Sequence, residues 1–195
     1  MIDQSEELFI NRLKEGHESA FRQLVSIYGN RIFRICSQMT STLPEAEDLT
    51  QEVFIAIVES ILQFKGQSKI STWIHKIAVS KCLELKRAKV AKKRAGFVVS
   101  IFGGKDINQS ALEIPDHFSS SAAIENEQLS LIIKAALNKL PENQKMSLIL
   151  SKMEEYSYKE IAYIMNISIP AVESLIFRAK HNMKKLLADF YKKNK

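Results

Sequence analysis

The chain has 195 residues, 46% of them apolar and 26% charged, which is ordinary for a soluble globular protein with one medium domain or two small ones. Only six Gly and four Pro occur, which argues against a fold rich in strands and turns and for an all-helical one. The formal net charge of +6 favours an anionic partner such as nucleic acid, although a solvated Lys-rich surface would give the same total.

Several classes of protein are excluded by what the chain lacks. Cys36 and Cys82 lie far apart, without a CxxC motif or a His at metal-ligand spacing, so we expect two reduced core residues and no metal or cofactor. The four His are scattered, and no triad, paired carboxylates or phosphate loop is evident, so we predict no catalytic residues, no enzyme and no small-molecule substrate. The acidic N-terminus is no signal peptide, and no apolar run approaches the ~20 residues of a membrane span. We therefore expect a cytoplasmic protein that does not insert into a membrane.

Three helices are expected in the first half of the chain. The first covers 21–35, where apolar residues alternate spacings of four and three: Phe21, Val25, Tyr28, Ile32 and Ile35. The second opens at Pro44, with an inner face of Ala46, Leu49, Val53 and Ile57. A polar loop follows over 65–71. The third helix turns Trp73, Ile74, Ile77, Ala78, Cys82 and Leu85 inward and runs into a basic segment over 86–94.

Charge is segregated along these helices. Segment 45–59 holds five acids and no base, whereas segment 81–94 holds seven bases and one acid. The acidic flank fits a solvated face favoured by the helix dipole, or a surface that docks on a basic protein. The basic segment can follow phosphates, and we favour nucleic acid as its partner. Trp73 fits the core, or a pocket that holds bases pulled out of a duplex.

Periodicity stops between Ala95 and about Ser121, where paired Gly, a Pro and serines predict a linker. Its apolar stretch 97–102 predicts that part of the linker packs on a domain or under a partner. Helical pattern resumes near Ile124, with two inner stripes separated by Pro141. The first stripe is Leu129, Ile133, Ala136 and Leu140, and the second is Met146, Ile149, Leu150 and Met153.

Residues 156–180 predict a helix-turn-helix. Ser157 and Glu160 form a capping box, after which Ile161, Ala162, Ile164 and Met165 supply a buried face. Asn166 suits a left-handed turn, Ser168 a helix cap and Pro170 a first helical turn. Val172 and Ile176 then face inward. The remaining face could enter a DNA major groove, although a plain packed helical hairpin with a basic surface has the same pattern.

The order of these pieces resembles the extracytoplasmic-function sigma factors of bacteria over nearly the whole chain. The motifs that carry the resemblance are "AEDLTQEVF" (46–54), "FKGQSKISTWIHKIAVSKCLELKR" (64–87), the linker and the C-terminal helix-turn-helix. The resemblance implies an all-α fold of two small helical domains, with region 2 over 1–95, a flexible linker over 96–123 and region 4 over 124–195. It implies core RNA polymerase (clamp helices and flap) and promoter DNA as partners, and an anti-sigma factor that could trap the linker.

The resemblance also implies roles for particular residues. Asp48, Gln51 and Glu52 match the clamp-docking motif. The residues matched to recognition and opening of the −10 element are Phe64, Lys65, Gln67, Ser68, Lys69, Ser71, Trp73, Lys76, Ser80, Lys81, Lys86 and Arg87. Those matched to the −35 element are Ser168, Ala171, Glu173, Ser174, Phe177, Arg178, Lys180 and His181.

The chain departs from the family pattern in both elements. Ser80 stands where Asn is usual and Glu84 replaces a frequent Asp, which leaves the preferred −10 base open. The usual Thr-Val-Lys-Ser-Arg of the recognition helix is Ala-Val-Glu-Ser-Leu over 171–175. Because Glu173 would repel a phosphate unless it accepts a hydrogen bond from a cytosine, we expect −35 recognition as a role without a stated sequence.

Two other functions compete with this interpretation. A stand-alone regulator would bind DNA as a dimer through the helix-turn-helix, but no seam for dimerisation is evident and "DLTQEVF" would have no task. A helical protein-interaction module without DNA binding is favoured only by the bases missing from the recognition helix.

Overall fold

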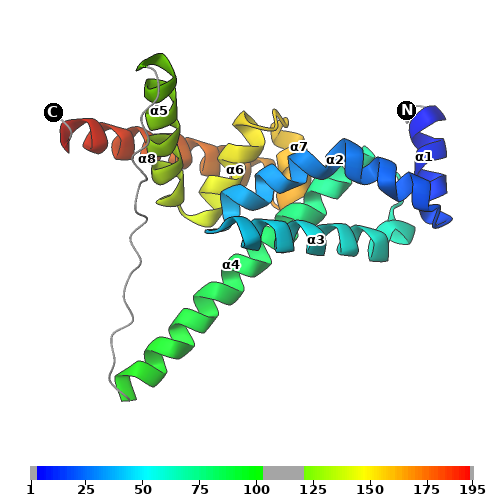
Figure 1. Ribbon diagram of the computed structural model, residues 1–195, viewed down its shortest axis with the longest axis horizontal. Coiled ribbons are helices and arrows are strands. Elements are labelled where there is room, and N and C mark those ends of the chain that lie inside the picture. Colours follow the sequence, from blue (N-terminus) through cyan, green and yellow to red (C-terminus); the bar gives the residue numbers. More distant parts are fainter. Residues whose placement is uncertain (1–3, 103–120, 194–195) are drawn as a thin grey trace.

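The computed structural model describes residues 4–102 and 121–193, with side chains over 4–92 and 129–188. In these ranges the regular secondary structure is entirely helical, which confirms the predicted all-α class. The helices are α1 (Gln4–Lys14), α2 (Glu18–Met39), α3 (Leu43–Ser60), η1 (a 3-10 turn, Ile61–Gln63), α4 (Ile70–Phe102), α5 (Ser121–Asn138), α6 (Glu142–Lys152), α7 (Tyr158–Met165) and α8 (Ile169–Lys193). Figure 1 shows α2 and α3 lying side by side across α4, with α5 and α8 at the opposite end from α1.

The N-terminal bundle, α1–α4, forms around apolar stripes on its helices. α3 buries all four predicted residues, Ala46, Leu49, Val53 and Ile57, and its N-terminus is capped by the Thr42 side chain. α2 buries Ile32 and Ile35 as predicted, but Val25 is 49% exposed. Ala20 and Leu24 are fully buried instead, because the inner stripe of α2 is set one residue earlier there.

Helix α1 was not predicted. The acidic N-terminal segment hides an amphipathic pattern in which Ile10 and Leu13 are buried. The Glu6 carboxylate Oε1 accepts a hydrogen bond of 3.2 Å from the backbone N–H of Ile70, the first residue of α4. Since the first N–H groups of a helix have no partner within it, α1 helps to fix where α4 begins.

The C-terminal bundle, α5–α8, contains the predicted helix-turn-helix. The Ser157 and Glu160 capping box is present at the start of α7, and Asn166 ends that helix in the left-handed conformation, with φ 54° and ψ 49°. The Ser168 hydroxyl accepts from the Ala171 N–H at 3.4 Å, so it caps α8 as expected. Local sequence therefore sets the turn between α7 and α8.

Two predicted inner stripes are wrong in part. Leu129 and Ile133 of α5 are 42% and 38% exposed, and Met153 is 42% exposed. α5 packs mainly on α8 through its last turns, where Ala136 and Leu137 are buried, and Leu140 is buried just after the helix ends. The apolar spacing correctly predicted which residues share a helix face. It could not predict how much of that face would be covered by another helix.

The two bundles pack against each other. One core cluster holds residues of both, from Ile10 in α1 to Ile176 in α8, and α7 lies along α4. α4 continues to Phe102, beyond residue 95 where the linker was expected to begin, and this end projects away from the body (Figure 1). The side chains of the apolar stretch 97–102 and all of 103–120 lie outside the described residues.

Candidate nucleic-acid interface

The predicted docking residues share one solvent-facing side of α3. Asp48, Gln51 and Glu52 are all exposed, while Leu49 and Val53 between them are buried. Spacings of three and four residues place the three polar side chains on one helix face. The structure thus brings them together as an acidic surface, with exposed Ile55 beside it.

The loop before α4 presents polar side chains above an aromatic pair. Lys65, Gln67 and Lys69 are exposed, and Ser68 and Ser71 are half-buried. Phe64 is only 3% exposed and packs on Trp73, with ring centroids 5.2 Å apart. In this arrangement Phe64 supports the loop through its contact with Trp73, and its predicted role in −10 binding stays a prediction.

The basic side of α4 is partly occupied by the C-terminal bundle. The Lys76 Nζ lies 4.3 Å from the centroid of the Tyr163 ring, a cation–π distance. The Lys86 Nζ forms an ion pair of 3.1 Å with Glu142. Ser80 donates to Glu84 at 2.8 Å, Lys81 is half-buried, and Arg87 is exposed. The structure therefore gathers the predicted basic residues on one helix but leaves only some of them open to a ligand.

The second helix of the helix-turn-helix is open on its outer face. Val172, Ile176 and Ala179 are buried, as the first two were predicted to be. The eight predicted contact residues lie on the other side: Ser168, Glu173, Phe177, Arg178, Lys180 and His181 are exposed, and Ala171 and Ser174 are half-buried. Phe177 is 74% exposed, and the Arg178 guanidinium donates to the Ser174 hydroxyl at 2.7 Å.

A buried carboxylate joins the two bundles. The Glu154 side chain is 1% exposed, with Oε2 3.2 Å from Arg31 Nε and Oε1 3.3 Å from Arg34 Nη2. Both contacts are within ion-pair distance, although neither has hydrogen-bond geometry. Both arginines belong to α2, and Glu154 lies in the turn between α6 and α7, so this charge is neutralised only when the bundles are packed.

A second polar contact lies beside this pair. His75 Nδ1 of α4 is 2.7 Å from the Ser71 carbonyl oxygen and 2.9 Å from the Tyr156 hydroxyl oxygen. Burial lowers the pKa of His75 below its usual 6.5, and burial raises the pKa of Tyr156 to about 12. Both groups are thus neutral near pH 7.

Sequence reasoning missed this junction. Glu154, Tyr156 and Arg31 carry no local motif that would link them. The two thiols were also treated as unrelated, whereas Cys36 and Cys82 hydrogen-bond to each other inside the core. That bond and burial raise the pKa of Cys82, so it is an un-ionised thiol.

The described residues were also considered as a metal site and as a membrane span. Within the described residues, no cluster of three His, Cys, Asp or Glu side chains could hold a metal ion. No single described helix is long and apolar enough to cross a membrane; α7 with α8 meets that test only as a pair bent by 100°.

Comparison with known proteins gives two family matches. The model for "Sigma-70 region 2" matches residues 24–91, and that for "Sigma-70, region 4" matches residues 130–183. The chain is 31% identical to the ECF RNA polymerase sigma-E factor of Haemophilus influenzae over 180 residues, 90% of this chain and 92% of the relative. It is 29% identical to the ECF RNA polymerase sigma factor SigW of Bacillus subtilis over 182 residues, 92% and 95% of the two chains.

Two solved structures share the fold. CnrH in complex with the cytosolic domain of CnrY gives a TM-score of 0.66 at 19% identity, covering 95% of this chain and 99% of the other. The sigma factor RpoE of Bartonella quintana, in complex with the anti-sigma factor NepR, gives 0.60 at 22% identity, covering 86% and 96%.

Proposed function

The chain belongs to the extracytoplasmic-function RNA polymerase sigma factors. We infer from this that three surfaces, on α3, on α4 with the loop before it, and on α8, bind the polymerase, the −10 element and the −35 element, respectively. A sigma factor directs core RNA polymerase to specific promoters at transcription initiation. The chemistry of RNA synthesis belongs to the polymerase, so this chain contributes binding and not catalysis.

The acidic face of α3 docks on the polymerase. Asp48, Gln51 and Glu52 project together from a helix whose opposite side is fixed in the core, so they present a preorganised anionic surface. A basic patch, as the resemblance implies for the clamp helices, is the complementary partner.

The loop 65–71 and α4 receive the −10 element. Exposed Lys65, Lys69 and Arg87 can neutralise phosphates, and half-buried Trp73 offers a ring for a flipped base to stack on. Unstacking a base costs a few kcal/mol, which contacts in this loop would offset.

The exposed face of α8 receives the −35 element. The observation that carries the proposal is this face: a capped helix-turn-helix that leaves Phe177, Arg178 and Lys180 open on its second helix. An α-helix fits the major groove of B-DNA, where Arg reads guanine and an apolar group can contact the thymine methyl.

An anti-sigma factor is a further proposed partner. CnrH and RpoE, which share the fold, were solved in complex with the cytosolic domain of CnrY and with the anti-sigma factor NepR, respectively. We also infer that the packed bundles separate on promoter binding, because Lys76 and Lys86 contact the C-terminal bundle when packed.

The test is co-purification with bacterial core RNA polymerase, followed by transcription from a library of randomised promoters. We expect a stable complex and transcripts that share −35 and −10 elements. Asp48→Ala with Glu52→Ala should weaken the complex, whereas Glu47→Ala, a neighbouring exposed acid of α3, should not. A complex unaffected by the folded double variant would overturn the docking assignment.

Another result would favour a different function. Retention of duplex DNA by a dimer, without any complex with core polymerase, would indicate a stand-alone helix-turn-helix regulator. Such a regulator needs a second apolar face for dimerisation.

A further inference from the structure

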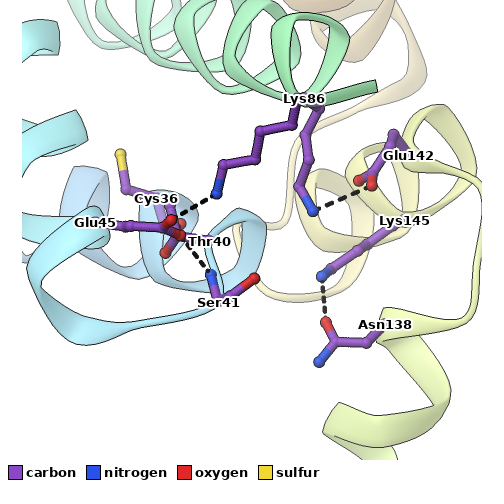
Figure 2. Close-up of polar contacts among 9 residues, drawn as sticks. Cys36, Thr40, Ser41, Glu45, Lys86, Asn138, Glu142 and Lys145 are labelled. Carbon is purple, nitrogen blue, oxygen red and sulfur yellow. Dashed lines mark hydrogen bonds and ion pairs between the residues drawn. The ribbon is translucent and has the colours of Figure 1, made fainter. Parts of the chain in front are cut away.

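A polar cavity of about 350 Å³ lies where the two bundles meet. Its walls come from the α2–α3 turn, the first turn of α3, α4 and the end of α5; Ser41, Lys86, Lys134 and Asn138 are among the lining residues. Figure 2 shows the Lys86 and Lys145 side chains reaching into the space between α4 and α6, with Ser41 on one side and Asn138 on the other. Both bundles therefore contribute to one cavity.

Positive charge exceeds negative charge around this cavity. Lys89 pairs with Glu45 at 2.8 Å, and Lys86 pairs with Glu142 at 3.1 Å. Among the described residues, Lys134 and Lys145 have no carboxylate within ion-pair distance. Two ammonium groups thus lack an ion-pair partner in the described part of the chain, and Lys145 has only the more distant attraction of Glu142.

Lys145 is the unusual member of this group. It is 2% exposed, and its Nζ donates to the Asn138 Oδ1 at 2.6 Å. Burial and the neighbouring Lys86 and Lys134 lower its pKa to about 8, so it is mostly charged at pH 7. A buried ammonium held by one neutral amide is costly, and an anion beside it would remove much of that cost.

We propose that this cavity binds a small phosphate-bearing anion at the junction of the two bundles, held by Lys134 and Lys86, which line it, with the buried Lys145 ammonium beside its lining residue Asn138. A phosphate carries up to two negative charges and several acceptor oxygens, which suits ammonium groups that converge from α4, α5 and α6. The first turn of α3 lines the same cavity, and the N-terminus of a helix favours an anion. Glu45 and Glu142 are each paired with a lysine, which reduces their repulsion of an anion, and Glu142 keeps a second, buried oxygen that has no hydrogen-bond partner.

The ligand is either a free inorganic anion or the phosphate group of a nucleotide. Pyrophosphate is the smaller of the two ligands and therefore the simpler fit to a cavity of about 350 Å³. In both cases the anion contacts both bundles, so it stabilises the packed arrangement over a separated one.

The experiment is a titration of the full chain at pH 7 with potassium pyrophosphate, ATP, or potassium sulfate at matched ionic strength, read by calorimetry and by the shift in Tm. We expect pyrophosphate to bind with a measurable Kd and to raise Tm by several degrees more than sulfate. Lys134→Ala should weaken binding at least tenfold, and so should Lys145→Met, which keeps the side-chain volume. Lys139→Ala is the matched control and should bind normally, because Lys139 is also an exposed lysine but lies on the loop after α5, outside the cavity.

The possible outcomes distinguish a nucleotide from a free anion, and they also show which result would overturn the site. Stronger binding of ATP than of pyrophosphate would indicate a nucleotide ligand, and the reverse a free anion; either supports the site. No binding beyond that of sulfate, or equal binding by the Lys134→Ala variant, would overturn it. Lys134→Ala changes an exposed residue, so it tests the site even where Lys145→Met does not fold. No polymerase or DNA is present, so the result is independent of the proposed function.

Discussion

The two helices proposed to contact DNA differ in how much of their surface is available. On α8 the outer face is open: Phe177 is 74% exposed, and Arg178 is hydrogen-bonded to Ser174, one turn earlier on the same helix. On α4 the corresponding basic face is covered in part, because Lys76 lies over Tyr163 and Lys86 is paired with Glu142. Both partners of α4 belong to the C-terminal bundle.

We infer from this difference that packing of the bundles limits access to the proposed DNA surface on α4 but not to the one on α8. A side chain engaged with the C-terminal bundle by a cation–π contact or an ion pair is less available to the phosphates of promoter DNA. Changes at the junction should therefore alter the availability of α4, whereas changes on α8 should act on duplex binding alone.

The largest effect is expected from Arg31→Ala with Arg34→Ala. The double variant leaves the buried Glu154 carboxylate without a partner; because both arginines are about half exposed, the cost should be below the ~3–5 kcal/mol of a fully buried pair. The bundles should separate, which would raise the radius of gyration in small-angle scattering and increase binding of single-stranded −10 DNA through α4.

The control is Arg22→Ala, which removes an exposed ion pair with Glu18 on the same helix. Exposed pairs contribute about 0–1 kcal/mol, so this variant should remain packed. A double variant with the same radius of gyration as the control would show that the shared apolar core, and not Glu154, holds the bundles together.

Arg178→Ala tests whether the exposed face of α8 binds duplex DNA. If Arg178 contacts a base, its loss should cost about 1–3 kcal/mol in binding to duplex −35 DNA and relax the preference at one position. If it contacts a phosphate, all sequences should weaken equally and the salt dependence should fall by about one ion. Binding of single-stranded DNA should be unchanged, and a loss there would contradict the separation of the two surfaces.

How far the sequence predicts this molecule depends on the range of the forces involved. The helix-turn-helix was predictable in detail because its signals are local: Ser157, Glu160 and Asn166 act within one turn of the chain. The inner face of α3 was predictable for the same reason, since its period is fixed by the helix.

The junction between the bundles was not predictable, because it joins residues far apart in the chain. Glu154 meets Arg31, and Tyr156 meets His75, with no motif that links them. The same holds for the contact of Cys36 with Cys82, and for helix α1, whose cap on Ile70 spans 64 positions. The exposed acidic face and the open face of α8 followed from periodicity, but the covering of Lys76 and Lys86 followed only from tertiary packing.

A smaller effect is expected from Ser157→Ala at the start of α7. The hydroxyl accepts from the Glu160 N–H at 3.3 Å, and loss of such a cap costs about 1 kcal/mol. Because α7 packs on α4 and also supports α8, this variant should lower Tm by a few degrees without preference for either DNA surface. Ser168→Ala, which removes the weaker 3.4 Å cap of α8, is the matched comparison. An effect confined to duplex binding would mean that α7 serves only the recognition helix.

The smallest expected effect is a pH dependence of the packed arrangement that comes from His75. Burial lowers the pKa of His75 below 6.5 in the folded protein, so the unfolded chain binds its proton more readily. Stability therefore rises with pH up to about 6.5 and is lost as pH falls below it. The groups that face His75 are the Ser71 carbonyl, Tyr156, Glu154 and Arg31; Tyr156, with a pKa of about 12, does not titrate there. Urea unfolding at pH 5.5 and 7.5 should show a smaller loss on acidification for His75→Gln than for the unchanged protein, and the exposed face of α8 should bind duplex DNA equally in both. Identical pH slopes would show that His75 does not make the packed arrangement depend on pH.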